Sequence, residues 1–556
     1  QKMSSEVRQW GPWALVLLGS FFLATAPFVL FRLQLGMWLP DILPQVSSDA
    51  LYYVKQMREV VDGHPSIGNP FIREYADAHF PGLVFPMWLG AVPGILGLGV
   101  NGMFAFNTIF YGVLGGVLLY VLCLKFTKGS QIISIGTTLI GVLSLHNFLI
   151  RPILQIVYPT LAIFLLCLLG VLEKPHGKWR YAGLGLVAVF AFYLYPHLWM
   201  PIFAAIGFLF LRALWMRDAK TVRHLIVMGF GIAVACLPQI LVIVQLFSDS
   251  EAEALSLRSG LVETHRVLPL TVLNLKYMIL AVLGISLFRQ RRPLSHAEWA
   301  LLYICGGILA AAFSNVITGK EMEFETHPLW VAFFLNAVAL AVFADVCLRS
   351  RGFARAISAV MVCAFLFTLT ARTVRNSLTY LWRFDAAAAQ ELQDYRRVLT
   401  FLETAAPGEE VILAPDLLSN YIPLYSNDYV FFDGWALLHV IPDHELLERF
   451  LVQHVDATDE FLRNNVRSVA GWGPGRAARY QNAYGGRVKP ITFFGGEEFI
   501  RSALKKHRDI QSQYEVYLQK YHVKYAITDT EAQDNPRIPG GASVIYTDDR
   551  FTLYQL

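Results

Sequence analysis

The chain has 556 residues, of which 55% are hydrophobic and only 16% are charged, and its mean hydropathy is +0.45. This composition excludes an ordinary soluble globular protein of this length and predicts a polytopic membrane protein. The formal net charge of +4 is too small to indicate nucleic-acid binding. All six cysteines lie in apolar segments and none forms a CxxC motif, so neither a disulfide framework nor a cysteine metal site is predicted.

Long apolar segments follow one another from the N-terminus to about residue 373. A membrane-spanning helix needs about 20 predominantly apolar residues, and the candidate spans are 13–33, 103–124, 131–149, 158–172, 181–195, 198–215, 225–246, 270–288, 297–317, 328–347 and 353–373. The first of them has no small-residue cleavage site, which favours a membrane anchor over a signal peptide. A further apolar run, 81–99, is short and rich in proline and glycine, and it predicts a re-entrant or interfacial helix.

The basic residues between the spans indicate how often the chain crosses the membrane. If 81–99 does not cross and the N-terminus is cytoplasmic, every strongly basic loop faces the cytoplasm, as the positive-inside rule requires. These loops contain Lys125, Lys128, Lys174, Lys178, Arg180, Arg212, Arg217, Lys220, Arg223, Arg289, Arg291, Arg292, Arg349, Arg351 and Arg355. We therefore expect about eleven crossings in a bacterial inner or plasma membrane. The loop 34–102 and the chain after about residue 374 then face the periplasm or the cell exterior.

The first outer loop contains the sequence Ser47-Ser48-Asp49, directly before an amphipathic stretch at 50–61. A carboxylate at the membrane boundary can act as a general base toward an acceptor hydroxyl or amine, or it can bind a divalent cation that holds a phosphate. Serine and aspartate at this position also suit the N-cap of the following helix. Capping and catalysis are compatible, so both interpretations of Asp49 remain open.

Other polar residues of the outer segments are candidates for binding a phosphorylated substrate. Asp77 and His79 alternate as in an extended segment, which points both side chains the same way, although a solvated loop explains them equally well. Arg151 lies beside Pro152 where a span meets the outer surface, and it suits either a bidentate phosphate contact or a snorkelling position near lipid headgroups. The remaining candidate phosphate ligands are Arg73, Lys320, Arg258 and Arg266.

Further polar side chains are expected to line a substrate cavity at the outer ends of the spans. His197 follows Tyr195 and Pro196 at the end of a span, where an interfacial histidine with a structural role is the alternative. Glu263 and His265 lie in the loop 247–269, which either folds over the cavity or is a plain acidic outer loop. The other predicted lining residues are Asp77, His79, Tyr158, Glu321, Glu323 and His327.

The chain changes character after about residue 385. Short apolar segments at 409–416, 429–434, 523–529 and 551–554 are typical of strands, and helical patterns occur at 443–454 and 497–520. Strands that alternate with helices predict an α/β layer domain. This region contains no GxGxxG, nucleophile elbow or Walker motif, so it either recognises an acceptor or is a structural cap.

The layout of the whole chain resembles the GT-C fold glycosyltransferases, a class that includes protein O-mannosyltransferases, oligosaccharyltransferases and the transferases that place aminoarabinose on lipid A. Two segments carry the resemblance most specifically. They are the segment around Asp49 and the segment 315–327, where a Thr-Gly turn precedes polar residues and His327. The resemblance implies a transmembrane catalytic domain over residues 1–384, including the first outer loop at 34–102, and a soluble, extracytoplasmic α/β domain over 385–556.

The same resemblance implies an inverting transferase that moves a sugar from a polyprenyl-phosphate donor, at the outer face of the membrane, to a lipid, glycan or protein acceptor. Asp49 is then the expected base, Arg151, Lys320 and Arg73 are the expected phosphate ligands, and no cofactor is required. A related enzyme with a lipid diphosphate donor would need Mg²⁺ or Mn²⁺. A transporter and a structural or assembly protein are the alternatives outside enzymes, although few ionisable residues lie in mid-span and no inverted repeat is evident. Membrane lipids are expected partners, and nucleic acid is not.

Overall fold

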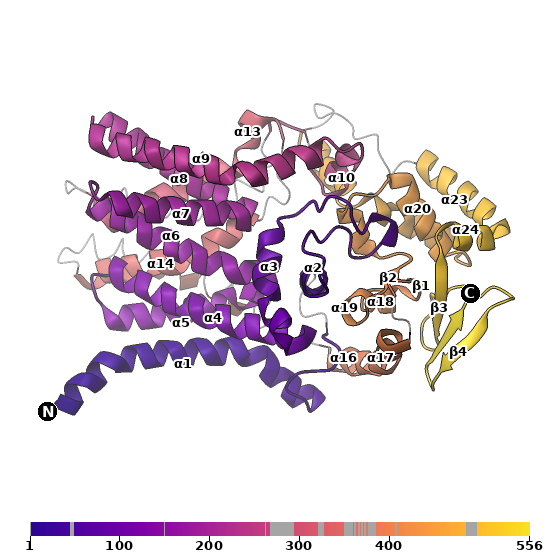
Figure 1. Ribbon diagram of the computed structural model, residues 1–556. Coiled ribbons are helices and arrows are strands. Elements are labelled where there is room, and N and C mark those ends of the chain that lie inside the picture. The colour runs from indigo at the N-terminus through magenta and orange to yellow at the C-terminus, as the bar shows by residue number, and fades with distance from the viewer. Residues whose placement is uncertain are drawn as a thin grey trace.

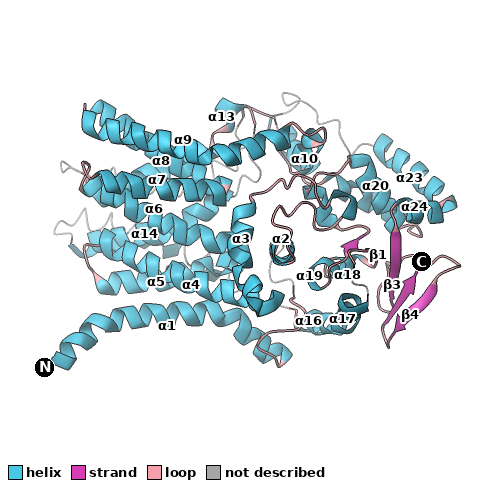
Figure 2. Cartoon of the chain, in the orientation of Figure 1, coloured by secondary structure: helices cyan, strands magenta, loops and turns pink. Residues whose placement is uncertain are grey.

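The computed structural model describes residues 2–44, 49–149, 151–261, 263–266, 294–320, 327–349, 385–405, 408–484 and 497–556, together with scattered positions between 360 and 375. In these residues the protein consists of a bundle of long apolar helices and an α/β part at one end of the bundle (Figure 1). All five described strands belong to the α/β part (Figure 2). The predicted class, an α-helical membrane protein with a C-terminal α/β region, is therefore confirmed in its broad form.

The helices of the bundle occur where the apolar segments predicted them. They are α1 (Lys2–Leu35), α4 (Gly99–Phe126), α5 (Gln131–Leu149), α6 (Pro152–Glu173), α7 (Lys178–Leu194), α8 (Pro196–Trp215), α9 (Ala219–Phe247), α12 (His296–Ala312) and α14 (His327–Arg349). Six helical segments of the described chain are long and apolar enough to cross a membrane, which indicates an integral membrane protein. The predicted spans 270–288 and 353–373 lie wholly or largely outside the described residues, so the total of about eleven crossings remains a prediction.

The apolar run 81–99 forms a short helix that does not follow the direction of the bundle. This helix, α3 (Val84–Pro93), runs across the ends of the bundle helices (Figure 1). It is joined to α4 by the turn η2 (Gly94–Leu98), and the φ angles of Gly97 and Gly99 at this junction are 93° and 63°. Glycine adopts such angles without steric strain, so these two residues permit the change of direction. The position of α3 agrees with the predicted interfacial helix.

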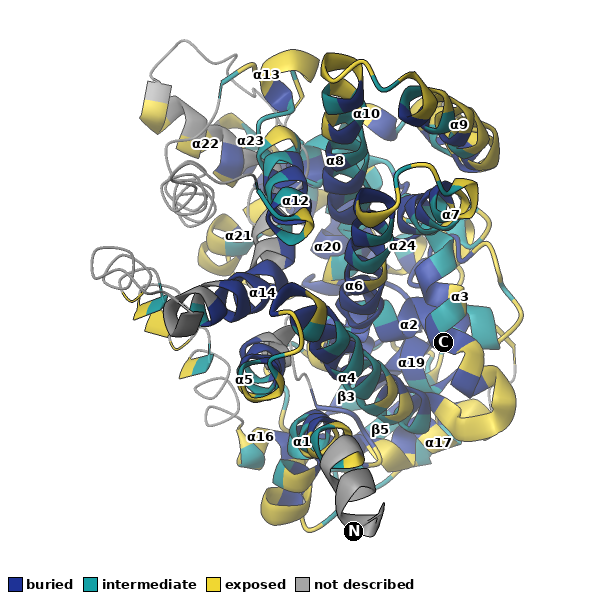
Figure 3. Cartoon of the chain, turned by 90° about the vertical axis from the view of Figure 1, so that its left-hand side faces the viewer, coloured by how far each residue is buried: buried dark blue, intermediate teal, exposed yellow. Residues whose placement is uncertain are grey.

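Burial differs strongly between the helices of the bundle. In the most apolar 18-residue window of α6, 78% of the residues are buried, against 17% for the segment that forms α9. α6 lies inside the bundle, whereas α9 lies at its edge and is exposed along most of its length (Figure 3). The exposed side chains of α9 are mostly large and apolar, such as Ile226, Phe230 and Val234. A continuous apolar surface of this kind suits contact with lipid rather than water.

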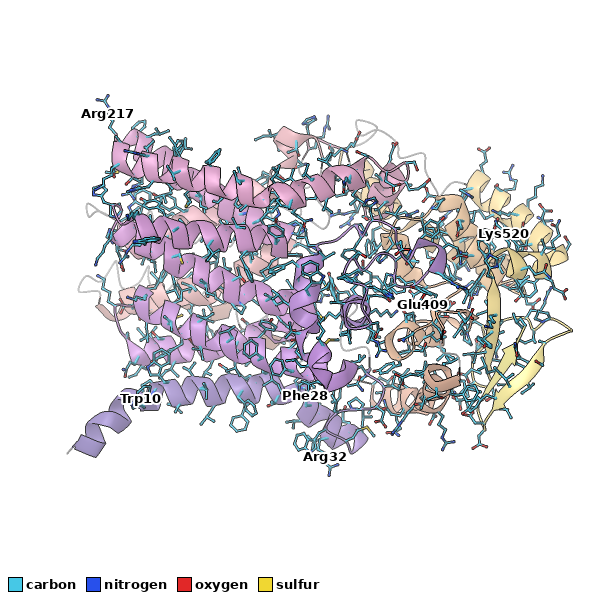
Figure 4. The ribbon with its side chains drawn as sticks, viewed as in Figure 1. Trp10, Phe28, Arg32, Arg217, Glu409 and Lys520 are labelled. Atoms are coloured by element: carbon cyan, nitrogen blue, oxygen red, sulfur yellow. The ribbon has the colours of Figure 1, made fainter. Side chains whose placement is uncertain are left out.

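The two ends of the bundle differ in what they carry. The N-terminus and Arg217, in the loop between α8 and α9, lie at the end farthest from the α/β part (Figures 1 and 4). Lys520, in the α/β part, lies toward the opposite end of the molecule, and Glu409 lies between it and the bundle (Figure 4). This is the arrangement required if the N-terminus and the basic loops share one side of a membrane and the α/β part occupies the other.

The α/β part contains a mixed five-stranded sheet in the order β2-β1-β3-β5-β4. β1 (Val411–Leu413) is parallel to β2 (Tyr429–Val430) and to β3 (Val523–Asp529), and β5 (Phe551–Gln555) is antiparallel to β3 and to β4 (Ser543–Thr547). The helices of this part are α16 (Ala386–Glu391), α17 (Tyr395–Ala405), α18 (Asp416–Ser419), α19 (Ile422–Tyr425), α20 (Asp443–Gln453), α21 (Asp459–Asn465), α22 (Gly473–Tyr484), α23 (Glu497–Ser512) and α24 (Tyr514–Lys520), with the 3-10 turns η3 (Leu392–Asp394), η4 (Gly434–Leu438) and η5 (Val466–Ala470).

The first outer loop is built into the α/β part and does not lie free above the bundle. The backbone N–H of Val430, at the end of β2, donates to the carbonyl oxygen of Phe71 (2.9 Å). Lys55, on α2 (Ala50–Val61), pairs with Asp433 directly after β2 (2.9 Å). The expected division at residue 384 separates the two regions in sequence, but in space the loop and the residues after 385 form one unit.

Candidate active site between the bundle and the α/β part

The side chains of Asp49 and Arg151 meet, although they come from different parts of the sequence. The distance from Nε of Arg151 to Oδ1 of Asp49 is 3.1 Å, and the two side chains are 17% and 20% exposed, respectively. Partial burial strengthens such an ion pair because less water screens the charges. The pair holds the carboxylate in one place and leaves part of it accessible.

Both residues stand directly before a helix. Asp49 precedes α2 and Arg151 precedes α6, whose first residue is Pro152. The carboxylate of Asp49 accepts no capping hydrogen bond from the first turn of α2, so the capping interpretation of this side chain does not describe the structure. The proline at the first helical position has a backbone angle suited to a helix start, and it sets where α6 begins and where Arg151 lies.

Tyr158 lies on α6 in the neighbourhood of Arg151. Its side chain is almost completely buried, stacks on Phe334 of α14 with the ring centroids 5.8 Å apart, and lies within electrostatic range of Arg151. Among the described residues its hydroxyl has no hydrogen-bond partner. Because a buried hydroxyl without a partner is unfavourable, this group is suited to a hydrogen bond with a ligand or with water.

His327, at the start of α14, brings two more residues to the same place. The hydroxyl of Tyr195 lies 2.9 Å from Nδ1 of His327. The rings of His197 and His327 are nearly perpendicular, with their centroids 4.6 Å apart. The positive charge of Arg151 interacts electrostatically with the His327 ring. Asp49 and Arg151 therefore form one contact, Tyr195, His197 and His327 form a second, and an electrostatic interaction between Arg151 and His327 links the two groups, which we name the Asp49 cluster.

Arg476, which was not selected from the sequence, adds a cation from the α/β part. It lies on α22 within electrostatic range of His327, it is only 2% exposed, and its Nη1 donates to the carbonyl oxygen of Gly260 (2.8 Å). A Cβ at Gly260 would lie 2.7 Å from Cδ of Arg476, so glycine makes room for this side chain. In the sequence Arg476 follows the glycine-rich segment 471–475, which is typical of an ordinary loop, so only its position in space distinguishes it.

The starts of four helices converge at this cluster. Asp49, Arg151, Tyr195 and His327 stand at the N-terminal ends of α2, α6, α8 and α14. The N-terminus of a helix carries a partial positive charge and unpaired N–H groups, and it therefore attracts anions. Arg151 adds a positive charge beside the Asp49 carboxylate, and Arg476 adds one near His327. This environment suits a phosphate group with a base beside it.

Lys320, Glu263 and His265 form a separate cluster. The charged groups of Lys320 and Glu263 are 3.8 Å apart, and their side chains are 62% and 66% exposed. Nδ1 of His265 donates to the carbonyl oxygen of Val316 (3.1 Å), which joins this loop to α13 (Asn315–Thr318). These contacts do not support the expected role of Lys320 as a phosphate ligand. Glu321 and Glu323 lie outside the described residues.

The other candidates from the outer loops contact the α/β part. Nη1 of Arg73, in the turn η1 (Arg73–Tyr75), lies 3.6 Å from Oε2 of Glu410, and Asp77 and His79 follow as exposed side chains of the same loop. Arg258 is completely buried and donates to the carbonyl oxygens of residues 437, 439 and 441, so it holds α10 (Ala252–Arg258) against η4 and the segment after it. The backbone N–H of Arg266 donates to Thr264 within its own loop. These contacts hold the loops in place, and they do not form a phosphate site.

In the part of the chain that the structure describes, no three histidine, cysteine, aspartate or glutamate side chains are placed as ligands of one metal ion. No family model matches the chain, and no curated protein is significantly similar to it. The geometry of the Asp49 cluster is therefore the main basis for a functional proposal.

Proposed function

We propose that the protein is an inverting GT-C-type glycosyltransferase that moves a sugar from a polyprenyl-phosphate donor to a lipid, glycan or protein acceptor. The observation that carries this proposal is the Asp49–Arg151 pair at the converging helix starts, beside His327 and Arg476. A base next to an anion-attracting environment, between an apolar bundle and a polar domain, suits a substrate whose phosphate lies at the membrane surface and whose chain lies in lipid.

In the proposed reaction, Asp49 accepts the proton of the acceptor hydroxyl or amine as that atom forms a bond to the anomeric carbon. The bond from this carbon to the phosphate oxygen breaks, and its electron pair leaves with the polyprenyl phosphate. In this mechanism Arg151, which lies beside Asp49, contacts the phosphate, and Arg476 adds a second cation for the developing charge. Attack from the face opposite the phosphate inverts the configuration of the anomeric carbon.

The proposal also assigns the two ends of the bundle to the two sides of the membrane. The N-terminus and the basic loops are placed in the cytoplasm, and the α/β part with the Asp49 cluster is placed in the periplasm or at the cell exterior. The reason is the concentration of lysine and arginine in the loops at one side. A donor that has been moved to the outer leaflet would then reach Asp49 from the lipid.

The deciding experiment measures transfer of a labelled hexose from its polyprenyl-phosphate carrier into the lipids, glycans and proteins of native membranes. The Asp49→Asn variant keeps the size and capping ability of the side chain, but asparagine cannot act as a base. Transfer should therefore fall by roughly 10²–10⁴-fold. Asp62→Asn is the matched control, because Asp62 ends the same helix and its carboxylate pairs with Arg58 (2.6 Å). Full activity of Asp49→Asn, with a normal thermal transition, would refute the proposed base.

A chelator separates this mechanism from the one with a lipid diphosphate donor. The monophosphate mechanism assigns no step to a metal ion, so EDTA should leave the rate nearly unchanged. Loss of transfer with EDTA and its recovery with Mg²⁺ or Mn²⁺ would favour the metal-dependent alternative. In that case a carboxylate of the cluster would act as a metal ligand, and the Asp49→Asn variant should also lose metal affinity.

A further inference from the structure

A cavity of about 270 Å³ lies within the α/β part, and its lining includes no residue of the Asp49 cluster. It is located at the carboxyl ends of the parallel strands β1 and β2, where Asp416 follows β1 and Asp433 follows β2. Residues of α20, α21 and η5 complete its wall. In open α/β sheets this edge is the usual place for a ligand, because the loops after parallel strands diverge there and leave a crevice.

The lining of the cavity mixes apolar and polar side chains. Phe432 and Phe450 are buried, whereas Asp416, Phe461 and Ser468 are exposed. Ligand pockets are usually apolar with a few polar groups, and their volumes are roughly 300–1,000 Å³. The volume here is just below that range, so the occupant must be small.

The charged groups of the lining are all acidic. Asp416 and Asp433 line the cavity, no lysine or arginine does, and the carboxylate of Asp534 accepts a hydrogen bond from the backbone N–H of Asp416 (2.8 Å). Lys55 balances Asp433, but among the described residues no lysine or arginine pairs with Asp416 or Asp534. Partial burial and the carboxylates of Asp534 and Asp433 raise the pKa of Asp416 to about 7. The lining therefore carries an uncompensated negative charge once Asp416 is ionised, above about pH 7.

His454 supplies an independent sign of a ligand. Its side chain is only 4% exposed, and its ring contacts those of Phe450 and Phe461 at centroid distances of 4.7 and 5.1 Å. Nε2 makes no hydrogen bond within the described chain, and Oδ2 of Asp416 lies 3.5 Å away. Burial lowers the pKa of His454 to about 4, so the imidazole is neutral near pH 7 and does not balance Asp416. A buried ring nitrogen without a hydrogen bond is unfavourable unless a ligand or a water molecule donates one to it.

We propose that this cavity binds a small ligand that carries a protonated primary amine. The ammonium group compensates the carboxylates of Asp416 and Asp534 and donates a hydrogen bond to Nε2 of His454. The rings of Phe450 and Phe461 add a cation–π attraction. Phosphate and carboxylate ligands are repelled by the same carboxylates, and an uncharged polyol leaves them without a counter-charge.

The site has a direct structural connection to the helix that follows Asp49. Asp433 lines the cavity and also pairs with Lys55 of α2. A ligand in the cavity would therefore lie next to the ion pair that anchors this helix. Binding itself does not depend on the proposed sugar transfer. It can therefore be measured on the full-length protein in detergent without any donor.

The test compares two compounds that differ only in the charged group, trans-4-aminocyclohexanol and trans-1,4-cyclohexanediol. Saturation-transfer NMR at pH 8, where Asp416 is ionised, should detect binding of the amine and not of the diol. Asp416→Asn should weaken binding about tenfold or more, which corresponds to losing a hydrogen bond to a charged group. Asp534→Asn should weaken binding by a smaller factor, because Asp534 lies behind Asp416 and acts through its charge. Asp509→Asn, at an exposed position of α23 that does not line the cavity, should bind as the wild type does.

Three results would overturn the proposal: no saturation of the amine by the wild-type protein, equal saturation of the diol, or undiminished binding in the aspartate variants. If Asp416→Asn does not fold, Asp534→Asn decides the question, because asparagine can still accept the hydrogen bond from the backbone of residue 416. Binding measured in Asp49→Asn keeps this proposal separate from the glycosyltransferase proposal, since that variant should bind the amine normally even if it transfers no sugar.

Discussion

The ammonium group of Lys55 and the carboxylate of Asp433 are 2.9 Å apart, and both side chains are completely buried. The ammonium group also lies 4.7 Å from the centroid of the Phe71 ring, and Oδ1 of Asp433 accepts a hydrogen bond from the backbone N–H of Trp435 (2.7 Å). Because Lys55 belongs to the helix that begins after Asp49, this contact ties the candidate base to the α/β part.

Replacement of Lys55 should destabilise the protein strongly. Lys55→Met keeps a long apolar side chain but leaves the carboxylate of Asp433 buried without its cation, which costs about 3–5 kcal/mol in comparable buried pairs. The double variant Lys55→Met/Asp433→Asn removes the uncompensated charge and should recover part of the loss. Thermal unfolding of the detergent-solubilised variants measures both effects.

The control for this experiment is a lysine at the protein surface. Lys524→Met removes the partner of Glu410, but Lys524 is well exposed, so its loss should change the thermal midpoint little. A Lys55→Met variant as stable as Lys524→Met, or a double variant less stable than Lys55→Met, would show that the buried pair does not stabilise this junction.

Arg151→Lys should impair transfer although the positive charge is retained. A lysine ammonium is a point charge and does not provide the planar fork that lets one arginine contact Asp49 and a phosphate at the same time. We expect kcat/KM for the polyprenyl-phosphate donor to fall about 10- to 100-fold, the effect of losing a hydrogen bond between charged groups. Arg73→Lys, at a position that faces Glu410, should keep most of the activity, and equal losses in the two variants would contradict the assignment of Arg151.

His439 should make the protein less stable in acid. Its ring is buried, its Nδ1 donates to the carbonyl oxygen of Gly68 (3.1 Å), and burial lowers its pKa from 6.5 to about 3. Between these two values the unfolded chain takes up a proton that the folded protein does not, so stability falls as the pH decreases from 6.5 toward 3. The loss is at most about 1.4 kcal/mol for each pH unit.

The contribution of His439 can be isolated by comparing variants at several pH values. His439→Asn keeps a donor for Gly68 but does not ionise, so the acid-induced decrease of the thermal midpoint should be smaller than in the wild type. The quantity to compare is the slope of the thermal midpoint against pH. Asp416 and Glu59 have pKa values raised to about 7, so their protonation stabilises the folded protein in the same pH range. Parallel slopes for the two proteins would exclude the proposed effect of His439.

The orientation in the membrane predicts which positions an impermeant thiol reagent can reach. Ser543 is exposed on β4 and Lys220 lies at the start of α9. If the proposed orientation is right, Ser543→Cys should be labelled from outside the membrane, and Lys220→Cys should be labelled only after lysis. The opposite pattern would place the Asp49 cluster on the cytoplasmic side and remove it from a donor in the outer leaflet.

Local sequence patterns were sufficient to predict most of the elements. The segment 523–529 is β3 as expected, and the helical pattern at 443–454 corresponds to α20 (Asp443–Gln453). β4 (Ser543–Thr547) was not predicted, because nearly all of its side chains are exposed and no apolar alternation marks it. Its β-branched and aromatic residues favour a strand, and its pairing with β5 establishes one.

The sequence by itself determined the membrane class, the positions of the helices and the selection of Asp49 and Arg151, because apolar length, charge distribution and proline position are local properties of the chain. Only the tertiary structure decided which of these residues meet. It joined Asp49 to Arg151 and placed Lys320 with Glu263 instead. It also brought Arg476 from the α/β part into range of His327. Such contacts depend on how whole helices pack against one another, and no pattern within a single segment contains that information.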